Sequence, residues 1–193
     1  MEEPDKLRIF IRVRKEDAAM SQLRAAIYLW FHGGNAVSVH TLAAAAHDCF
    51  CWMAKHKGKE SIHRKWMLTQ SKGFQKRVAD AQNFFKHGHK WLKGEVKYPP
   101  LYGELLMFDS VICYGMVFDS KTMPLPLRLY AVRFGIENGD ILEVDLSRFF
   151  LERDIIKELA PLSRQQFYEH GVSLLGHVES WMLWPDSQYL ESP

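Results

Sequence analysis

Apolar residues recur every three or four positions along most of this chain, which is the spacing of one face of an α-helix. The first such stretch starts at Glu16 and ends at Gly33-Gly34-Asn35, a sequence typical of a helix end. Its apolar positions are Ala19, Leu23, Ala26, Ile27, Trp30 and Phe31. The pattern therefore predicts a first amphipathic helix between these limits.

A second helix is predicted from Ser38, a candidate N-cap, to Lys57-Gly58. Its four consecutive alanines, Ala43 to Ala46, allow another helix to approach closely. A short helix is expected around Ile62 to Met67. The next long helix runs from Phe74 to His87, with Ser71 as a plausible cap and Gly88 directly after it.

Tyr98-Pro99-Pro100 interrupts the helical pattern, and Pro100 suits the first turn of a further helix that carries Leu101, Leu105, Phe108, Ile112 and Met116. After it, a short helix to Phe134, a turn at Asn138-Gly139-Asp140 and a helix from Ser163 to Leu183 are expected. Residues 141–150 remain ambiguous between extended chain and a capped turn.

These elements predict an all-α fold, an up-and-down bundle of four to five main helices with a C-terminal helical extension. Residues 1–14 alternate in polarity and form an N-terminal extended segment, residues 15–120 form the bundle, and residues 121–193 pack on it. A chain of 193 residues with 47% hydrophobic residues is long enough for one well-buried core.

Charge is nearly balanced, with 25 basic against 23 acidic residues and a net charge of +2, which is too small to argue for nucleic acid. The stretch from Lys55 to Lys97 is nevertheless locally basic. Two interpretations stay open for this stretch: a solvated helical face, or a surface that attracts phosphate.

Cys49, Cys51 and Cys113 are odd in number and do not form a metal-type C-x-x-C spacing, so we interpret them as small core residues in a reducing compartment. The N-terminus is acidic and lacks an apolar signal region, and no apolar run reaches membrane-spanning length. We expect a cytoplasmic protein without a membrane partner.

The helix from Phe74 to His87 carries the candidate chemistry. Phe74, Val78, Ala81 and Phe85 form its buried stripe, while a polar stripe of Lys76, Asp80, Asn83 and His87 lies about 100 to 150 degrees away. An asparagine one turn before a histidine can hold that ring in one orientation, as general acid–base catalysis needs. The alternative is that His87 only caps the helix next to Gly88.

The sequence Asn83-Phe84-Phe85-Lys86-His87, together with the segments Leu23–Phe31 and Ser38–Ala46, resembles a bacterial group of small, mostly uncharacterised helical proteins similar to the HEPN superfamily. The resemblance covers roughly Lys15 to Phe118. It implies a helical bundle, a homodimer, and a role in stress or phage defence. Many HEPN domains are metal-independent ribonucleases in which an arginine, commonly followed by asparagine, precedes a histidine.

This chain departs from that motif at Gln82, which stands where the family has its arginine. The nearest upstream arginine, Arg77, lies about 15 Å along the helix from His87, at 1.5 Å per residue. A neutral glutamine donates a hydrogen bond but cannot neutralise the charge that develops on a phosphate. We therefore expect little or no nuclease activity.

Two functions remain as hypotheses: a homodimeric binding or regulatory module, or a weak metal-independent endoribonuclease at a dimer cleft. RNA or a nucleotide is the expected ligand, and no cofactor is predicted. No metal site is predicted either, because His87-Gly88-His89 lacks further ligands and His40 and His47 are better explained as core-edge histidines. The candidate catalytic residues are His87, Asn83 and Gln82, and the candidate binding residues are Lys76, Asp80, Lys86, His89 and Lys90.

Overall fold

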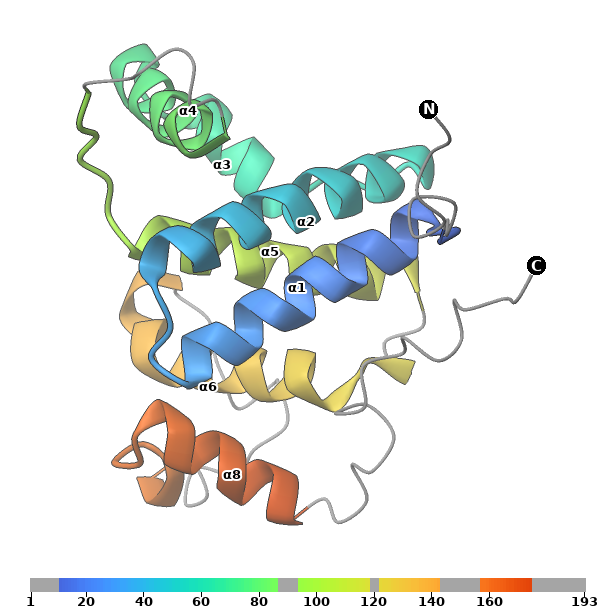
Figure 1. Cartoon of the computed structure of the whole chain (residues 1–193), viewed down its shortest axis with the longest axis vertical. Coiled ribbons are helices and arrows are strands. Elements are labelled where there is room, and N and C mark those ends of the chain that lie inside the picture. Colours follow the sequence, from blue (N-terminus) through green and yellow to red (C-terminus); the bar gives the residue numbers. More distant parts are fainter. Residues whose placement is uncertain (1–10, 87–93, 119–121, 143–156, 175–193) are drawn as a thin grey trace, which may run out of the picture.

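The computed structural model describes residues 11–86, 94–118, 122–142 and 157–174, and these residues form helices and connecting segments without a strand. The all-α fold class is therefore confirmed. The helices, which Figure 1 shows as a bundle, are α1 (Lys15–Phe31), α2 (Ala36–His56), α3 (Ile62–Thr69), α4 (Lys72–Lys86), α5 (Leu101–Val117), α6 (Leu125–Leu142) and α8 (Arg164–Leu174).

The start of α2 differs from the sequence prediction by three residues. Asn35, not Ser38, is the N-cap, because the Asn35 side chain accepts hydrogen bonds from the backbone N–H groups of Val37 and Ser38. Gly33 adopts a φ of 68°, a conformation that glycine tolerates without strain, and this lets the chain turn from α1 into α2.

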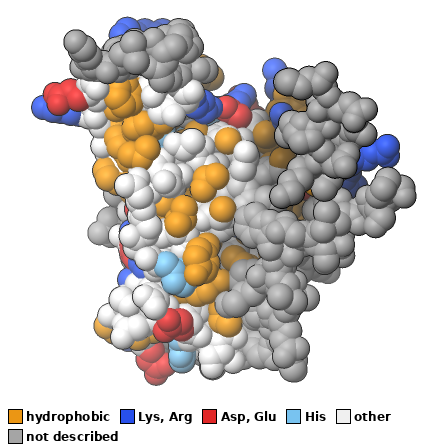
Figure 2. All heavy atoms as spheres, viewed as in Figure 1, with side chains coloured by type: hydrophobic (Ala, Val, Ile, Leu, Met, Phe, Trp, Pro, Cys, Tyr) orange, Lys and Arg blue, Asp and Glu red, His pale blue; other side chains and the backbone are white. Residues whose placement is uncertain are grey.

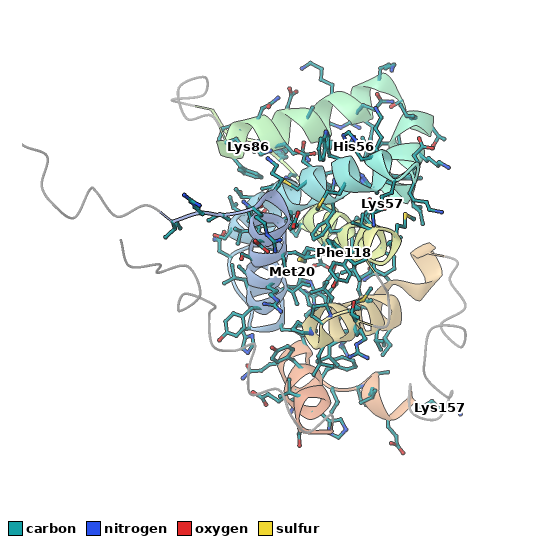
Figure 3. All side chains as sticks on the ribbon, turned by 90° about the vertical axis from the view of Figure 1, so that its right-hand side faces the viewer. Met20, His56, Lys57, Lys86, Phe118 and Lys157 are labelled. Carbon is teal, nitrogen blue, oxygen red and sulfur yellow. The ribbon has the colours of Figure 1, made fainter. Side chains whose placement is uncertain are left out.

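Helices α2 and α5 pack against each other and run in the same direction. Gly103 at the start of α5 lies against His40 near the start of α2, whereas the Lys57 ammonium after α2 donates to the Val117 carbonyl at the end of α5. Figure 3 shows Lys57 and Phe118 at these neighbouring helix ends. Helices α3 and α4 lie between α2 and α5 in the sequence and return the chain to the end where α2 begins, so that α5 can run parallel to α2.

Small residues allow this close packing. Ala43, Ala44 and Ala46 are buried, as the alanine run predicts. A Cβ atom added at Gly103 would lie 3.1 Å from the Cα atom of His40, so a larger residue here would push α5 and α2 apart by a few tenths of an ångström. The helix register that results determines which side chains of α2 and α5 meet.

Helices α3 and α4 form one end of the molecule, at the top of Figure 1. Ser61 caps α3 by accepting a hydrogen bond from the backbone N–H of Arg64. Ser71 accepts a hydrogen bond from the backbone N–H of Phe74, which supports its predicted role as the cap of α4. Both helices start where a serine satisfies a free N–H group.

Helix α6 extends beyond the predicted end at Phe134, so the short-helix prediction was wrong in length. The predicted turn at Asn138 is present only as a kink within α6, where Asn138 has a φ of −129° and a ψ of 21°. The remainder of the predicted final helix beyond Leu174, the ambiguous residues 143–150 and most of the N-terminal segment lie outside the described residues.

Helix α8 begins with a reciprocal cap in which Ser163 and Gln166 each accept a hydrogen bond from the other's backbone N–H. Its Arg164 bridges Glu104 of α5 and Glu137 of α6, and the guanidinium carbon lies 3.8 Å from the ring centre of Trp30. These contacts attach the C-terminal helix to three helices of the bundle.

No described helix is long and apolar enough to cross a membrane. Apolar side chains nevertheless reach the surface on the face drawn in Figure 2. The core beneath is rich in aromatic residues, with Phe31, Phe50, Tyr130 and Phe134 fully buried. Against this apolar interior, a group of polar side chains between α2 and α5 stands out.

Candidate functional site

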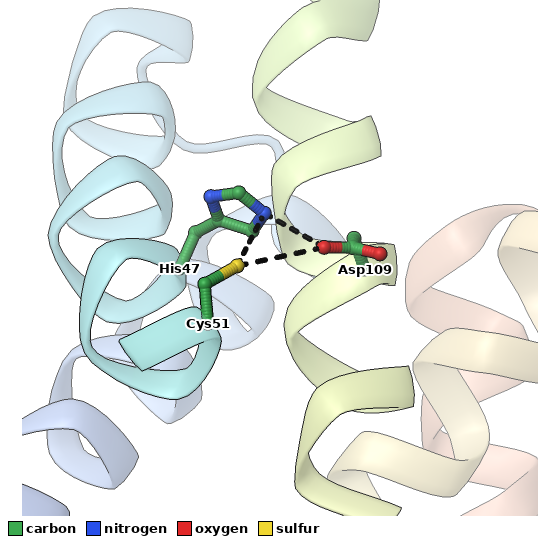
Figure 4. Close-up of side chains that lie close together, drawn as sticks. All are labelled: His47, Cys51 and Asp109. Atoms are coloured by element: carbon green, nitrogen blue, oxygen red, sulfur yellow. Dashed lines mark hydrogen bonds and ion pairs between the residues drawn. The ribbon is translucent and has the colours of Figure 1, made fainter. Parts of the chain in front are cut away.

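A histidine, a cysteine and an aspartate meet in the interface between α2 and α5 (Figure 4). His47 and Cys51 are one turn apart on α2, and Asp109 faces them from α5. The His47 Nε2 atom lies 2.8 Å from Asp109 Oδ2 and 3.2 Å from Cys51 Sγ, while Cys51 Sγ lies 3.8 Å from the same Oδ2 atom. All three residues are at most 4% exposed.

Helix α3 supplies two further hydrogen bonds to the Asp109 carboxylate. The Ser61 hydroxyl donates to Oδ2 at 2.6 Å, and the backbone N–H of His63 donates to Oδ1 at 3.1 Å. The Cys113 thiol, one turn further along α5, also approaches Oδ2, at 3.7 Å. The carboxylate is therefore oriented by three helices, although it lies in the core.

Hydrogen bonding to charged partners sets the protonation of this cluster. Burial raises the pKa of Asp109, but hydrogen bonds from His47 and Ser61 outweigh burial and lower that pKa to about 2. Burial likewise lowers the pKa of His47, and its hydrogen bonds and attraction to Asp109 and Cys51 raise it to about 9. The Cys113 hydrogen bond lowers the pKa of the Cys51 thiol, and the pKa of Cys113 is raised in return.

The cluster has the residue types of a nucleophilic triad but not its geometry. In such a triad one ring nitrogen faces the acid and the other faces the nucleophile. Here Asp109 and Cys51 both contact the Nε2 atom of His47, and Figure 4 shows the second ring nitrogen pointing away from both. The arrangement cannot relay a proton from Cys51 through the ring to Asp109.

A pocket of about 210 Å³ lies beside the cluster, between α2, α3, α4 and α5. Exposed and buried residues both line it, so it connects the surface with the cluster through His47. The lining residues are His47, Asp48, His63, Arg64, Met67, Gln75, Val78, Ala79, Gln82, Tyr102 and Leu106.

His63 is the most unusual residue of this pocket. Its side chain is buried, and neither ring nitrogen has a hydrogen-bond partner within the part of the chain that the structure describes. Burial, with the nearby positive charge of His47, lowers the pKa of His63 to about 4, so the ring is neutral near pH 7. A neutral imidazole has one donor and one acceptor to offer.

Two of the residues that line the pocket, Asp48 and Arg64, are charged, and Lys86 pairs with Asp48. The Asp48 carboxylate lies 3.6 Å from the Arg64 guanidinium of α3 and 3.8 Å from the Lys86 ammonium of α4. Lys86 marks the end of α4 in Figure 3. These exposed pairs contribute little stability, but they hold two cations beside the pocket.

The structure separates the residues that the sequence grouped on α4. Gln82 lines the pocket, whereas Asn83 is exposed. Lys76 and Asp80 form an exposed ion pair with each other at 2.9 Å, one turn apart. Lys86 reaches the pocket opening through Asp48. His87, His89 and Lys90 lie outside the described residues.

Sequence reasoning missed the roles of Cys51, Asp109 and Ser61, and it interpreted His47 as a core-edge histidine without a ligand role. One signal was present: Asp109 is an acidic residue in the otherwise apolar stretch from Leu105 to Met116. A buried carboxylate needs partners, so this position points to a polar cluster in the core. His40 was expected to have a satisfied ring, but both of its ring nitrogens are buried without a partner among the described residues.

A comparison of the chain with models of known protein families, with curated proteins and with solved structures finds no match.

Proposed function

We propose that this protein is a binding module of the HEPN-like kind that acts as a homodimer and holds RNA, or a nucleotide, with one base in the pocket between α2, α3, α4 and α5. In this proposal it has little or no nuclease activity. The observation that carries it is His63, which lines the pocket and whose two ring nitrogens are buried without a partner among the described residues. A buried polar group without a partner is costly, so a bound polar ligand would stabilise it.

The walls of the pocket suit a nucleobase. Met67, Val78 and Leu106 provide apolar surface, and Tyr102 provides an aromatic ring that lies 5.4 Å, centre to centre, from the His63 ring. Single-stranded RNA is commonly bound by stacking a base on such side chains and by hydrogen bonds to its edges. His63 and Gln82 each have both a donor and an acceptor for those edges.

Cations beside the pocket suit the phosphates that accompany a base. Arg64 lines the pocket, and the Lys86 ammonium lies 3.8 Å from Asp48, which also lines it. Asp48 pairs with both cations, so a phosphate would compete with this carboxylate for them. This arrangement favours the phosphate-attracting interpretation of the basic middle region.

The expectation of little or no nuclease activity draws support from the placement of the motif residues. The glutamine that replaces the family arginine contributes to the pocket, but the exposed Asn83 does not line it. A ribonuclease of this kind needs a cation and a histidine at the same phosphate. Neutral Gln82 provides hydrogen bonds for recognition instead.

The proposed homodimer draws support from large apolar side chains that remain exposed at the end of α2 and on α3. Trp52 is 56% exposed, Ile62 is 55% exposed and Leu68 is 73% exposed. Exposed apolar side chains of this size are available for contacts between protein chains. Light scattering at micromolar concentration should give twice the 22.5 kDa chain mass, and a monomeric mass would contradict this part of the proposal.

Binding is tested by the fluorescence anisotropy of labelled single-stranded RNA oligonucleotides, with competition by free mononucleotides. Two variants of neighbouring residues on α3 separate pocket binding from general charge attraction. Arg64→Ala and Lys65→Ala each remove one positive charge. Arg64 lines the pocket, whereas Lys65 pairs with Glu60 and does not line it. Arg64→Ala should weaken binding by roughly tenfold or more, the 1.4 kcal/mol of one charge-assisted contact, and Lys65→Ala by much less.

Equal losses in the two variants would show nonspecific attraction to the basic surface, and no binding at all would overturn the proposal. The same samples are incubated with RNA in the presence of a chelator. Cleavage that disappears in a His87→Ala variant would replace the binding module by the weak metal-independent endoribonuclease.

A further inference from the structure

We infer that His47, Cys51, Asp109 and His63 form a binding site for a divalent transition-metal ion, with zinc as the best match. This inference concerns the buried cluster and does not depend on RNA binding in the neighbouring pocket, although the two share His63: one ring nitrogen would bind the metal ion, which leaves the other for a base.

Convergence of three ligand atoms on one point is the first argument. The Nε2, Sγ and Oδ2 atoms of His47, Cys51 and Asp109 lie within 4.8 Å of one another. In a tetrahedral zinc site with Zn–N and Zn–O distances near 2.0–2.1 Å and a Zn–S distance near 2.3 Å, such atoms are about 3.4–3.6 Å apart. The observed separations of 2.8, 3.2 and 3.8 Å differ from these values by well under 1 Å.

The second argument is that His47 and Asp109 each offer one atom to more than one partner. The Nε2 atom of His47 carries at most one hydrogen, yet it faces both a carboxylate oxygen and a cysteine sulfur. Oδ2 of Asp109 is also shared, since Ser61 donates to it. A cation bound between the three ligand atoms would interact favourably with all of them at once, which a single proton cannot do.

His63 is the fourth ligand in this proposal. Its ring centre lies 5.2 Å from that of His47. Two imidazoles bound to one tetrahedral zinc have ring centres about 5 Å apart, given a Zn–N distance near 2.0–2.1 Å. The His63 nitrogens are outside the three-atom group, so the ring must turn toward it; no hydrogen bond from a described residue holds the ring in its present orientation.

Charge balance supports this ligand set. A thiolate from Cys51, a carboxylate from Asp109 and two neutral imidazoles carry two negative charges in total, which a divalent cation neutralises. A buried site without net charge avoids the large cost of desolvating an unpaired ion. Thiolate and imidazole ligands favour zinc or a similar transition metal over magnesium and calcium, which prefer oxygen.

The surrounding residues already act as a second layer of support. The Ser61 hydroxyl and the His63 backbone N–H fix the Asp109 carboxylate from α3. Hydrogen bonds of this kind orient the carboxylate ligands of metal sites. Cys113 remains a thiol that donates toward the carboxylate, since its Sγ atom lies 3.7 Å from Oδ2.

Cobalt binding provides the test. The full-length protein is stripped with a chelator under reducing conditions and titrated with Co²⁺, whose tetrahedral thiolate complexes show intense visible absorption and a thiolate charge-transfer band. We expect both signals, saturation at one ion per chain, displacement by Zn²⁺ and a rise in melting temperature on adding Zn²⁺.

Variants of two cysteines on α2 distinguish the cluster from adventitious thiol binding. Cys51→Ser should lower Co²⁺ affinity at least a hundredfold and remove the charge-transfer band, whereas Cys49→Ser, only two residues away but outside the cluster, should bind like the parent. His63→Ala should weaken binding at least tenfold and change the visible spectrum, because one ligand is lost. If Cys51→Ser fails to fold, the parent spectrum still decides the question. Absence of tetrahedral absorption in the parent, or equal losses in Cys49→Ser and Cys51→Ser, would overturn the inference.

Discussion

Replacing Ser61 by alanine should destabilise the protein far more than is usual for the loss of a helix cap. The Ser61 hydroxyl oxygen accepts from the Arg64 backbone N–H at 2.9 Å, and its hydrogen is donated to Asp109 at 2.6 Å. Loss of a serine cap costs about 1 kcal/mol, and loss of a hydrogen bond to a charged group costs about 1.5–3 kcal/mol. Ser61→Ala should therefore lower the free energy of unfolding by about 2.5–4 kcal/mol, the sum of these two costs.

Ser71→Ala is the matched control. Ser71 caps α4 through the backbone N–H of Phe74 at 3.3 Å, and it is exposed. This substitution should cost only about 0.5–1 kcal/mol, the lower part of the range for caps. Urea unfolding followed by far-ultraviolet circular dichroism measures both variants, in the presence of a chelator so that metal does not contribute. Equal costs for the two variants, with an unchanged dependence of the free energy on urea, would show that the Ser61–Asp109 hydrogen bond does not stabilise the fold.

Three further predictions concern packing, ion pairing and pH. Gly103→Ala should destabilise the protein by about 1–3 kcal/mol, because the new Cβ would lie 3.1 Å from the His40 Cα atom. The control, Gly73→Ala in the exposed first turn of α4, should be neutral or stabilising. Thermal melts in which both variants shift the melting temperature in the same direction would contradict the close packing of α2 on α5. Arg164→Ala should cost about 1–3 kcal/mol through its lost ion pairs and its contact with Trp30, whereas Arg128→Ala on the exposed face of α6 should cost under about 0.5 kcal/mol by urea unfolding. Despite burial, hydrogen bonds raise the pKa of His47 from 6.5 to about 9, so in chelator-treated protein its contribution is fully present below pH 6.5 and is lost as the pH rises to about 9. The predicted loss is at most about 3 kcal/mol, and a His47→Gln variant with the same pH profile as the parent would contradict it.

Structural features that depend on residues close together in the sequence could be predicted. The apolar spacing of α1 and the following Gly33-Gly34-Asn35 give this helix nearly its observed limits, Lys15–Phe31. The alanine run of α2 indicated close packing, which the burial of Ala43, Ala44 and Ala46 bears out. The N-cap of α2 was misplaced because Ser38 and Asn35 both suit a cap, and the spacing of apolar residues does not distinguish them.

The cluster could not be predicted because its members are far apart in the sequence. His47 and Asp109 are separated by 62 residues, and they meet only because α2 and α5 run in the same direction in a fixed register. Helical periodicity describes each helix alone and carries no information on that register. The same limit applies to Gln82, whose proximity to His63 depends on how α3 and α4 fold back over α2.

NMR of protein with ¹⁵N-labelled histidine rings tests whether His63 contacts the ligand in the pocket. The His63 signals are assigned with a His63→Gln variant, and a short oligoribonucleotide is titrated to saturation. The ring nitrogens of His63 should shift, whereas those of His32, which is exposed and hydrogen-bonded to the Tyr28 carbonyl oxygen, should not. Saturated RNA binding without a shift at His63 would show that His63 is not the ligand contact of the pocket.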